Sequence, residues 1–192
     1  IAQLFIIEAQ KCKGEIFSVV RKTMPSLRAS AMRDFIKLLR QYGLYHEENH
    51  NKSDNIYHLN GNEIEFFGLD EPQKVRGRKR KWLWLNEANE FSREDFMQLN
   101  LRTVERVFFD YNPSDEHHWI YEKIIPQKGC TFIHSTYLDN PFLESEVKLE
   151  IEKLRAEDEN YWRIYGLGEI GKRKSIIYTN WDIVDDFPAC DE

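Results

Sequence analysis

An apolar run that ends abruptly on polar residues is the feature of this sequence that most constrains its fold. Residues 82–85 read WLWL and are followed directly by Asn86 and Glu87. A short, continuous apolar run bounded by polar residues is typical of a strand buried on both faces, as in a parallel sheet. The sequence therefore predicts a buried strand whose carboxyl end presents an amide and a carboxylate at the edge of a sheet.

Strands and helices are expected to alternate along the rest of the chain. Residues 55–69 alternate apolar and polar side chains around a central Asn60-Gly61 pair, which is the pattern of a β-hairpin. Further strands are expected at 15–20, 106–112 and 131–137, and helices near 1–9, 25–42, 92–102, 117–125 and 142–156. Such alternation predicts an α/β fold with a mostly parallel sheet covered by helices on both faces, plus the hairpin.

Composition narrows the class of protein. With 192 residues, of which 41% are hydrophobic, the chain is large enough for one sizeable core. The net charge of −6 argues against a surface coated with basic residues for static binding of nucleic acid. Cys12, Cys130 and Cys190 form no C-x-x-C pair, which favours a reducing compartment such as the cytoplasm. No apolar stretch approaches the ~20 residues that span a bilayer, so no membrane association is expected.

Polar residues stand where three of the expected strands end. Arg21 follows the first strand, Glu87 follows the WLWL run, and Asp110 and Asn112 end the RVFFDYN strand. Ligands of open parallel sheets bind at the carboxyl ends of the strands, so this clustering predicts a site. A glutamate placed there can polarise a water molecule for attack on a phosphoryl group. The alternative is that Glu87 only caps the turn that follows it.

Five stretches, taken in order, resemble the large terminase subunit of tailed bacteriophages, the ATP-driven motor that packages DNA: VVRKTMPSLRAS, GLDEPQKVRG, WLWLNEANEF, DYNPSDEHHW and STYLDNPFL. The resemblance covers nearly the whole chain and implies a RecA-like P-loop NTPase core that uses ATP and Mg²⁺. It implies double-stranded viral DNA, a portal protein and a small terminase subunit as partners, with identical subunits assembled in a ring. It also implies a place in the cytoplasm of a bacterial host, at the viral procapsid.

The same resemblance implies how the chain is organised. Residues 1–170 correspond to a partial ATPase domain, and residues 171–192 to a linker toward a nuclease domain. The family's glycine-rich phosphate-binding loop is expected upstream of Ile1, and the nuclease domain beyond the linker. The chain alone is therefore expected to be inactive, whereas the intact protein is expected to hydrolyse ATP.

The resemblance assigns roles to five residues of this sequence. Glu87 corresponds to the catalytic glutamate of the Walker B strand, and Asn86 to the preceding acid that orders magnesium. An amide can hydrogen-bond a metal-bound water but brings no charge, so this departure puts magnesium affinity in doubt. Arg21 resembles a position near the nucleotide, and Asn112 lies in the motif that couples hydrolysis to movement. Arg76 resembles an arginine finger that acts on a neighbouring subunit's ATP.

Other interpretations of the same residues stay open. Arg76 belongs to a basic segment, KVRGRKRK, that is equally suited to solvent or to DNA phosphates. Arg21 can pair with a carboxylate instead of a phosphate. The whole chain can also be read as a metal-dependent nuclease in which Glu87, Asp110 and Asp139 gather two magnesium ions, or as a non-catalytic interaction module from a degenerate prophage.

Overall fold

The computed structural model describes residues 1–71, 77, 79–115 and 117–170. The chain divides into two compact units. The first comprises residues 1–113 and 117–134, and the second comprises residues 114–116 and 135–192. The strand-end residues singled out above, from position 21 to position 112, all belong to the first unit.

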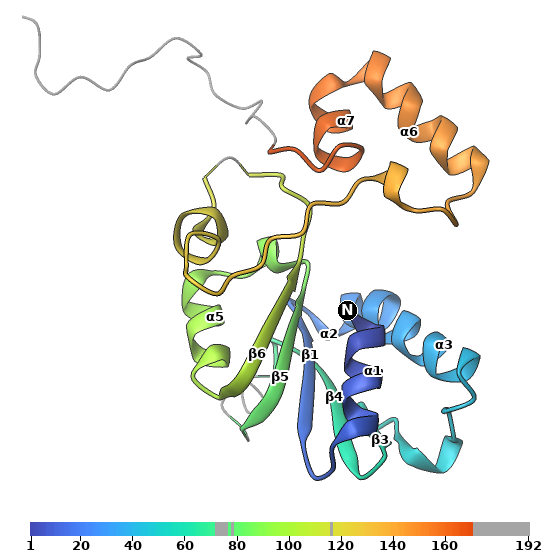
Figure 1. Ribbon diagram of the computed structural model, residues 1–192, viewed down its shortest axis with the longest axis vertical. Helices are drawn as coiled ribbons and strands as arrows, with labels where there is room; N and C mark the ends of the chain where they lie inside the picture. The colour runs from blue at the N-terminus through green and yellow to red at the C-terminus, as the bar shows by residue number, and fades with distance from the viewer. Residues whose placement is uncertain (72–76, 78, 116, 171–192) are drawn as a thin grey trace, which may run out of the picture. The chain divides into compact units, whose positions relative to one another are not determined.

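The first unit is built on a six-stranded sheet with the strand order β2-β3-β4-β1-β5-β6 (Figure 1). Its strands are β1 (Ile16–Arg21), β2 (His50–Asn51), β3 (Ile56–Leu59), β4 (Asn62–Gly68), β5 (Arg80–Asn86) and β6 (Thr103–Asp110). Strand β1 runs parallel to both β4 and β5, and β5 runs parallel to β6. The β2–β3 and β3–β4 pairs are antiparallel. The predicted mostly parallel sheet is confirmed.

The predicted hairpin is formed by β3 and β4. Asn60 and Gly61 connect the two strands with φ angles of 52° and 78°. Two consecutive residues with positive φ make the turn whose twist matches that of the flanking strands, and an Asn-Gly pair adopts it at low cost. The hairpin therefore adds the short antiparallel strand β3 beside β4, which is parallel to β1.

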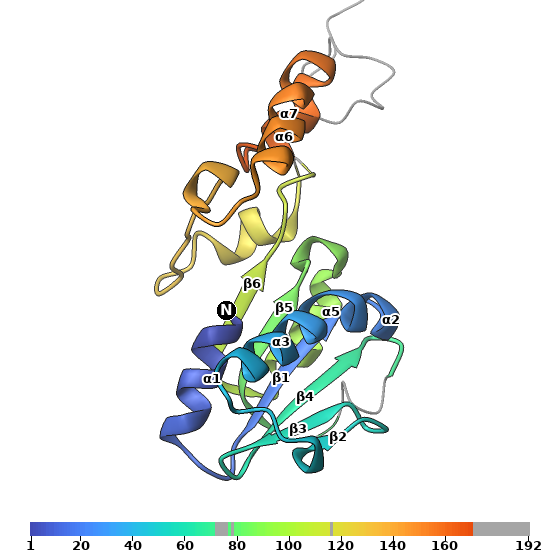
Figure 2. The ribbon, with the colours of Figure 1, turned by 90° about the vertical axis from the view of Figure 1, so that its right-hand side faces the viewer.

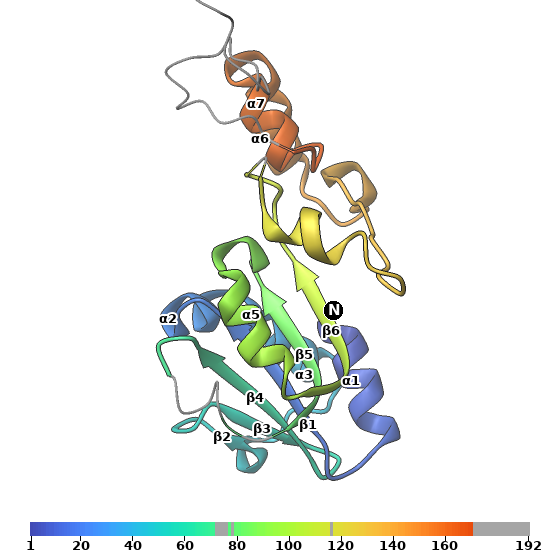
Figure 3. The same cartoon turned by 90° about the vertical axis from the view of Figure 1, so that its left-hand side faces the viewer.

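Helices cover both faces of the sheet, as expected (Figures 2 and 3). One face carries α1 (Ala2–Lys11), α2 (Met24–Leu27), η1 (Arg28–Met32) and α3 (Arg33–Gln41), and the other carries α5 (Arg93–Asn100) and η4 (Ile120–Ile124). Successive residues of a strand point to opposite faces. Trp84 accordingly packs in the first core, against fully buried Phe5, whereas Leu85 packs in the second, with Phe96.

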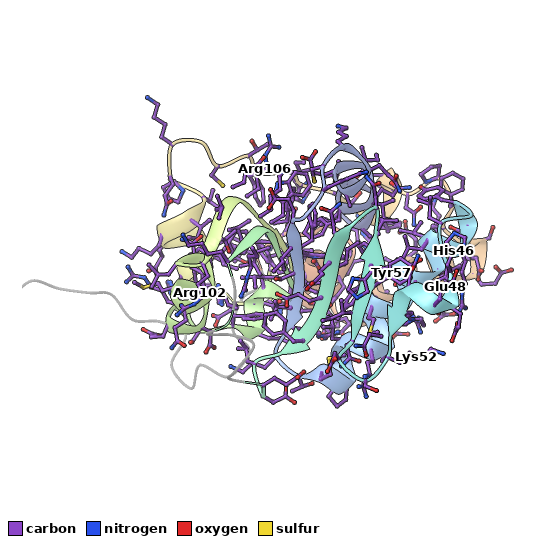
Figure 4. The ribbon with its side chains drawn as sticks, turned by 90° about the horizontal axis from the view of Figure 1, so that it is seen from below. His46, Glu48, Lys52, Tyr57, Arg102 and Arg106 are labelled. Carbon is purple, nitrogen blue, oxygen red and sulfur yellow. The ribbon has the colours of Figure 1, made fainter. Side chains whose placement is uncertain are left out.

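Side chains near the two lateral edges of the sheet contact a neighbouring loop and a neighbouring strand (Figure 4). On the β2–β3 side, the buried hydroxyl of Tyr57 accepts a hydrogen bond from the His46 backbone N–H at 2.9 Å and donates one to the Leu44 carbonyl at 2.6 Å. On the β6 side, the guanidinium of Arg106 lies 5.7 Å from the ring centroid of Trp82. Both edges are therefore anchored to buried aromatic residues.

Two expected elements differ from the structure. Residues 131–137 form no strand; only a short 3-10 turn, η5 (Tyr137–Asp139), begins at their end. The single helix expected over 25–42 is interrupted by the π-helical turn η1, where Ser30 has φ and ψ of −122° and −105°, outside the helical region. The interruption breaks the helical path and lets the Ser30 side chain reach the end of β5.

The described part of the second unit is mainly helical. It contains α6 (Ser145–Glu157) and α7 (Glu159–Tyr165), which pack against each other. Two further short helices among the described residues, η2 (Glu47–Asn49) and η3 (Ala88–Glu90), belong to the first unit. Among the described residues, no helix has the length and apolar character needed to cross a bilayer.

Candidate functional site

Three parallel strands end side by side at one edge of the sheet. Arg21 is the last residue of β1, Asn86 of β5 and Asp110 of β6. Because β5 lies between β1 and β6, its carboxyl end is flanked by a cation on one side and a carboxylate on the other. We call Arg21, Asn86, Glu87 and Asp110 the strand-end site. The predicted position of Glu87, at the end of an interior parallel strand, is confirmed.

Glu87 stands at the sharp turn that follows β5. Its φ and ψ of 53° and 58° are left-handed, a region that non-glycine residues rarely adopt and that clusters at functional sites. The side chain is half-buried, and burial is the main cause that raises the pKa of its carboxyl group. The Asp110 carboxylate raises this pKa further, while Arg21 lowers it. The turn thus directs a carboxyl group of raised pKa to the edge where ligands of parallel sheets bind.

Arg21 pairs with a carboxylate in this structure. Its Nη2 lies 3.0 Å from Glu90 Oε1, and its Nη1 donates a hydrogen bond to Ser30 Oγ at 3.0 Å. The hydrogen bond with Glu90 is the first cause of a raised Arg21 pKa. Of the two roles that the sequence left open, the ion pair is therefore the one formed here, and the contact with a nucleotide stays a prediction. Glu90 thereby positions this cation.

The Asn86 side chain is buried and held between two neighbours. Its Nδ2 donates to Asp110 Oδ2 at 2.8 Å, and its Oδ1 lies 3.3 Å from the Ser30 hydroxyl. That hydroxyl also donates to the Ser26 carbonyl at 2.7 Å, so its single proton is shared between two acceptors. The amide that was expected to bind a metal-bound water is thus oriented by protein groups on both sides.

Asp110 is the residue that connects the strand ends. Its Oδ1 accepts a hydrogen bond from the Trp84 indole N–H, and its Oδ2 accepts from the Asn86 amide and, at 3.4 Å, from the Glu87 backbone N–H. Sequence reasoning placed Asp110 at a strand end but gave it no part in the ATPase site. The cross-strand pairing of Asn86 with Asp110, which the register sets, is the signal that was missing.

Asn112 and Arg76 are the other two residues to which the sequence assigns roles. Asn112 was expected to end the strand at 106–112, but β6 ends at Asp110, so Asn112 is exposed two residues beyond the strand that pairs with β5. Arg76 lies outside the residues that the structure describes. The roles assigned to both remain predictions.

The strand-end site has the donors that a nucleotide-bound magnesium ion requires, although it forms no protein cage for a metal. Among the described residues, no group of three or more His, Cys, Asp or Glu side chains is placed to hold a metal ion. Magnesium in phosphoryl-transfer sites is held by one or two carboxylates together with substrate phosphates, and the Asp110 carboxylate, beside the Asn86 amide, fits that requirement. The nuclease interpretation needs Asp139 as well, but that carboxylate accepts hydrogen bonds from the N–H and hydroxyl of Thr136.

The fold and the strand-end site together define an α/β protein whose site lies at the carboxyl edge of a parallel sheet. The chain belongs to the phage terminase large subunit family, which matches residues 1–169. It is 30% identical over 128 residues to the large terminase subunit of Bacillus phage SPP1, a match that covers 57% of this chain and 30% of that protein. It is 26% identical over 152 residues to the PBSX phage terminase large subunit of Bacillus subtilis strain 168, covering 65% of this chain and 35% of that protein. The chain therefore spans about a third of the length of these curated relatives.

Solved structures of large terminases share the fold. The large terminase of a thermophilic bacteriophage superposes with a TM-score of 0.77 at 21% identity, covering 94% of this chain and 47% of that one. The complex of the same terminase with ADP gives a TM-score of 0.71 at 20% identity and covers 88% of this chain and 43% of that one. The ATPase domain of the Thermus phage P74-26 large terminase gives 0.56 at 13% identity, covering 88% of this chain and 82% of that domain. The expected RecA-like core is confirmed.

Proposed function

We propose that this chain is the ATP-hydrolysing core of a motor subunit that moves viral double-stranded DNA into a procapsid. The observation that carries the proposal is the place of Glu87, at the end of an interior parallel strand with Arg21 on one side and Asp110 on the other. Membership of the terminase large subunit family and the ADP and ATP-gamma-S complexes of the thermophilic phage terminase support it. Its partners are the DNA, the portal protein and the small terminase subunit, at the procapsid in the bacterial cytoplasm.

Glu87 acts as the general base in this proposal. A base works best when its pKa lies near the operating pH, and burial together with Asp110 raises the pKa of Glu87 in that direction. Arg21, whose charge lowers the same pKa, keeps the carboxylate form accessible. The left-handed turn fixes where the carboxylate points, so the attacking water is oriented without reorganisation of the backbone.

The remaining groups of the site act on the phosphates. Magnesium, bound together with ATP, neutralises charge on the transferred phosphoryl group; Asp110 and Asn86 are the residues that would contact its water shell. Arg21 contributes positive charge beside the phosphates, and Asn112 transmits hydrolysis to the segment after β6. Arg76 completes a neighbouring subunit's site as an arginine finger within a ring of identical subunits.

The proposed domain organisation follows the same family. Residues 1–170 are the partial ATPase domain, and residues 171–192 are the linker toward a nuclease domain. In this family a glycine-rich phosphate-binding loop grips the β- and γ-phosphates. The intact protein, rather than this chain alone, is the form in which hydrolysis is to be measured.

The test is Glu87→Gln in the intact protein, with Glu94→Gln on the exposed face of α5 as the matched control. Loss of the base should lower ATP turnover at least ~100-fold, while the affinity for ATP-gamma-S stays within about twofold because the phosphate grip lies elsewhere. Glu94→Gln should change neither quantity. Equal losses of binding and turnover in Glu87→Gln would mean that Glu87 is structural. An intact protein that binds no nucleotide would instead support the non-catalytic interaction module.

A further inference from the structure

Asp110 occupies the position across from the asparagine that replaces the expected acid of the WLWL strand. We propose that Asp110 is a positioning residue for hydrolysis: its carboxylate, supplied from β6, orients Glu87 and provides the negative charge that Asn86 lacks. The inference rests on the proposed ATPase function. It adds Asp110 of β6 as a residue that supports Glu87, which follows β5.

The register of the sheet makes this exchange of roles possible. Asn86 and Asp110 are paired residues of β5 and β6, so their side chains leave the sheet at the same level. The Asn86 amide donates to Asp110 Oδ2 at 2.8 Å, which is a short, charge-assisted bond between the two strand ends. A carboxylate at position 110 therefore lies within one hydrogen bond of the place where a carboxylate at position 86 would stand.

The Asp110 carboxylate is held in a fixed orientation and still has a free position to accept a hydrogen bond. The buried Trp84 indole fixes Oδ1, while Asn86 and the Glu87 backbone N–H fix Oδ2. A carboxylate has about four acceptor positions, and these three donors leave one for a further donor such as a metal-bound water. Asn86 is held between Asp110 and Ser30, and its amide oxygen brings no negative charge to such a water.

The same carboxylate controls the direction of the catalytic side chain. Its bond to the Glu87 N–H, at 3.4 Å, is made to the first residue of the left-handed turn. Movement of the end of β6 is thereby passed to Glu87 through one side chain. Since Asn112 follows two residues later on the same segment, the residue proposed to respond to hydrolysis and the residue that orients the base share one strand end.

The test exchanges the two side chains in the intact protein. Asp110→Asn should lower kcat about 10- to 100-fold, the usual effect of removing a supporting carboxylate, with a smaller change in KM. It should also weaken the binding of ADP measured with Mg²⁺ more than the binding measured with EDTA. The double variant Asn86→Asp/Asp110→Asn keeps one carboxylate and one amide in contact, and it should recover most of both losses. Asp34→Asn, on the exposed start of α3, is the control and should match the unchanged protein.

Unfolding midpoints of all variants separate a structural defect from a loss of positioning. If Asp110→Asn does not fold, the double variant Asn86→Asp/Asp110→Asn is the test. The inference requires this double variant to fold and to hydrolyse ATP near the rate of the unchanged protein. A normal kcat in Asp110→Asn, or an exchange variant no better than the single one, overturns the inference while the proposed ATPase function stands. Failure of that function appears separately, as unchanged turnover in Glu87→Gln.

Discussion

Replacing Trp84 with phenylalanine removes one hydrogen bond from the strand-end site and leaves most of the aromatic ring in place. The indole N–H donates to the Asp110 carboxylate, and a hydrogen bond to a charged group contributes about 1.5–3 kcal/mol. The smaller ring gives up roughly 50 Å² of buried apolar surface, or about 1 kcal/mol. We therefore expect Trp84→Phe to reduce the free energy of unfolding by about 3 kcal/mol. For a chain of this size that corresponds to a fall of roughly 6–12 °C in Tm.

The neighbouring tryptophan of the same strand is a matched control. Trp82 is buried on the same face of β5, but its indole N–H has no hydrogen-bond partner among the described residues. Trp82→Phe loses a similar area without losing a hydrogen bond, so its cost should be about 1 kcal/mol. Urea unfolding of both variants, followed by circular dichroism, measures the difference. Equal costs for the two substitutions would show that the Trp84–Asp110 bond contributes nothing.

Three further predictions concern Glu87, Arg76 and Gly68. Glu87→Gln should stabilise the folded protein at pH 7 and not near pH 4. Burial raises the folded-state pKa of Glu87 above its ordinary value of 4.5. Ionisation of Glu87 therefore costs stability as the pH rises through the folded-state pKa, and the substitution removes that cost. The gain, measured by urea unfolding at both pH values, should be only about 0.5 kcal/mol because water screens a half-exposed carboxylate; a larger gain at pH 4 would contradict this reasoning. Arg76→Ala should lower ATP turnover roughly 10³-fold in the assembled motor, and added Glu87→Gln subunits should restore it because each supplies an intact Arg76 to its neighbour. If turnover is not restored, and the salt dependence of DNA binding has a slope smaller by about one, Arg76 contacts a DNA phosphate instead. Gly68→Ala should cost about 1–3 kcal/mol in urea unfolding, because its Cβ would stand 2.5 Å from the Met24 backbone nitrogen; a neutral effect would mean that this segment relaxes freely.

Most of the sheet was predictable because its strands carry local signals. The apolar runs of β1, β5 and β6 and the Asn60-Gly61 turn each specify an element within a few residues. The expected strand at 131–137 failed for a different reason: a strand needs a partner, and no local pattern shows whether one is available. The break at Ser30 was equally hidden, because a π-helical turn leaves the apolar spacing of the surrounding helix nearly intact.

The location of the candidate site was predictable from the sequence. The contacts between its side chains were less so. Parallel strands bring their carboxyl ends to one edge, so polar residues that end apolar runs were expected to meet there. The contacts between them depend on register and on distant segments. Arg21 pairs with Glu90, 69 residues away, and Asp110 reaches Asn86 only because β5 and β6 pair in one particular register. Neither contact leaves a mark in a sequence read alone.

Strand β6, which carries Asp110, is the last strand in the sheet order, and in the described structure it pairs only with β5. Every second backbone amide of such an edge strand points away from the sheet toward solvent. In hydrogen exchange, the β6 amides bonded to β5 should exchange slowly and the alternate ones quickly. Any strand that later adds to this edge, from this protein or from another, would slow the second set and stiffen the segment that orients Glu87. The exchange pattern of β6 thus reports directly on how firmly the site is held.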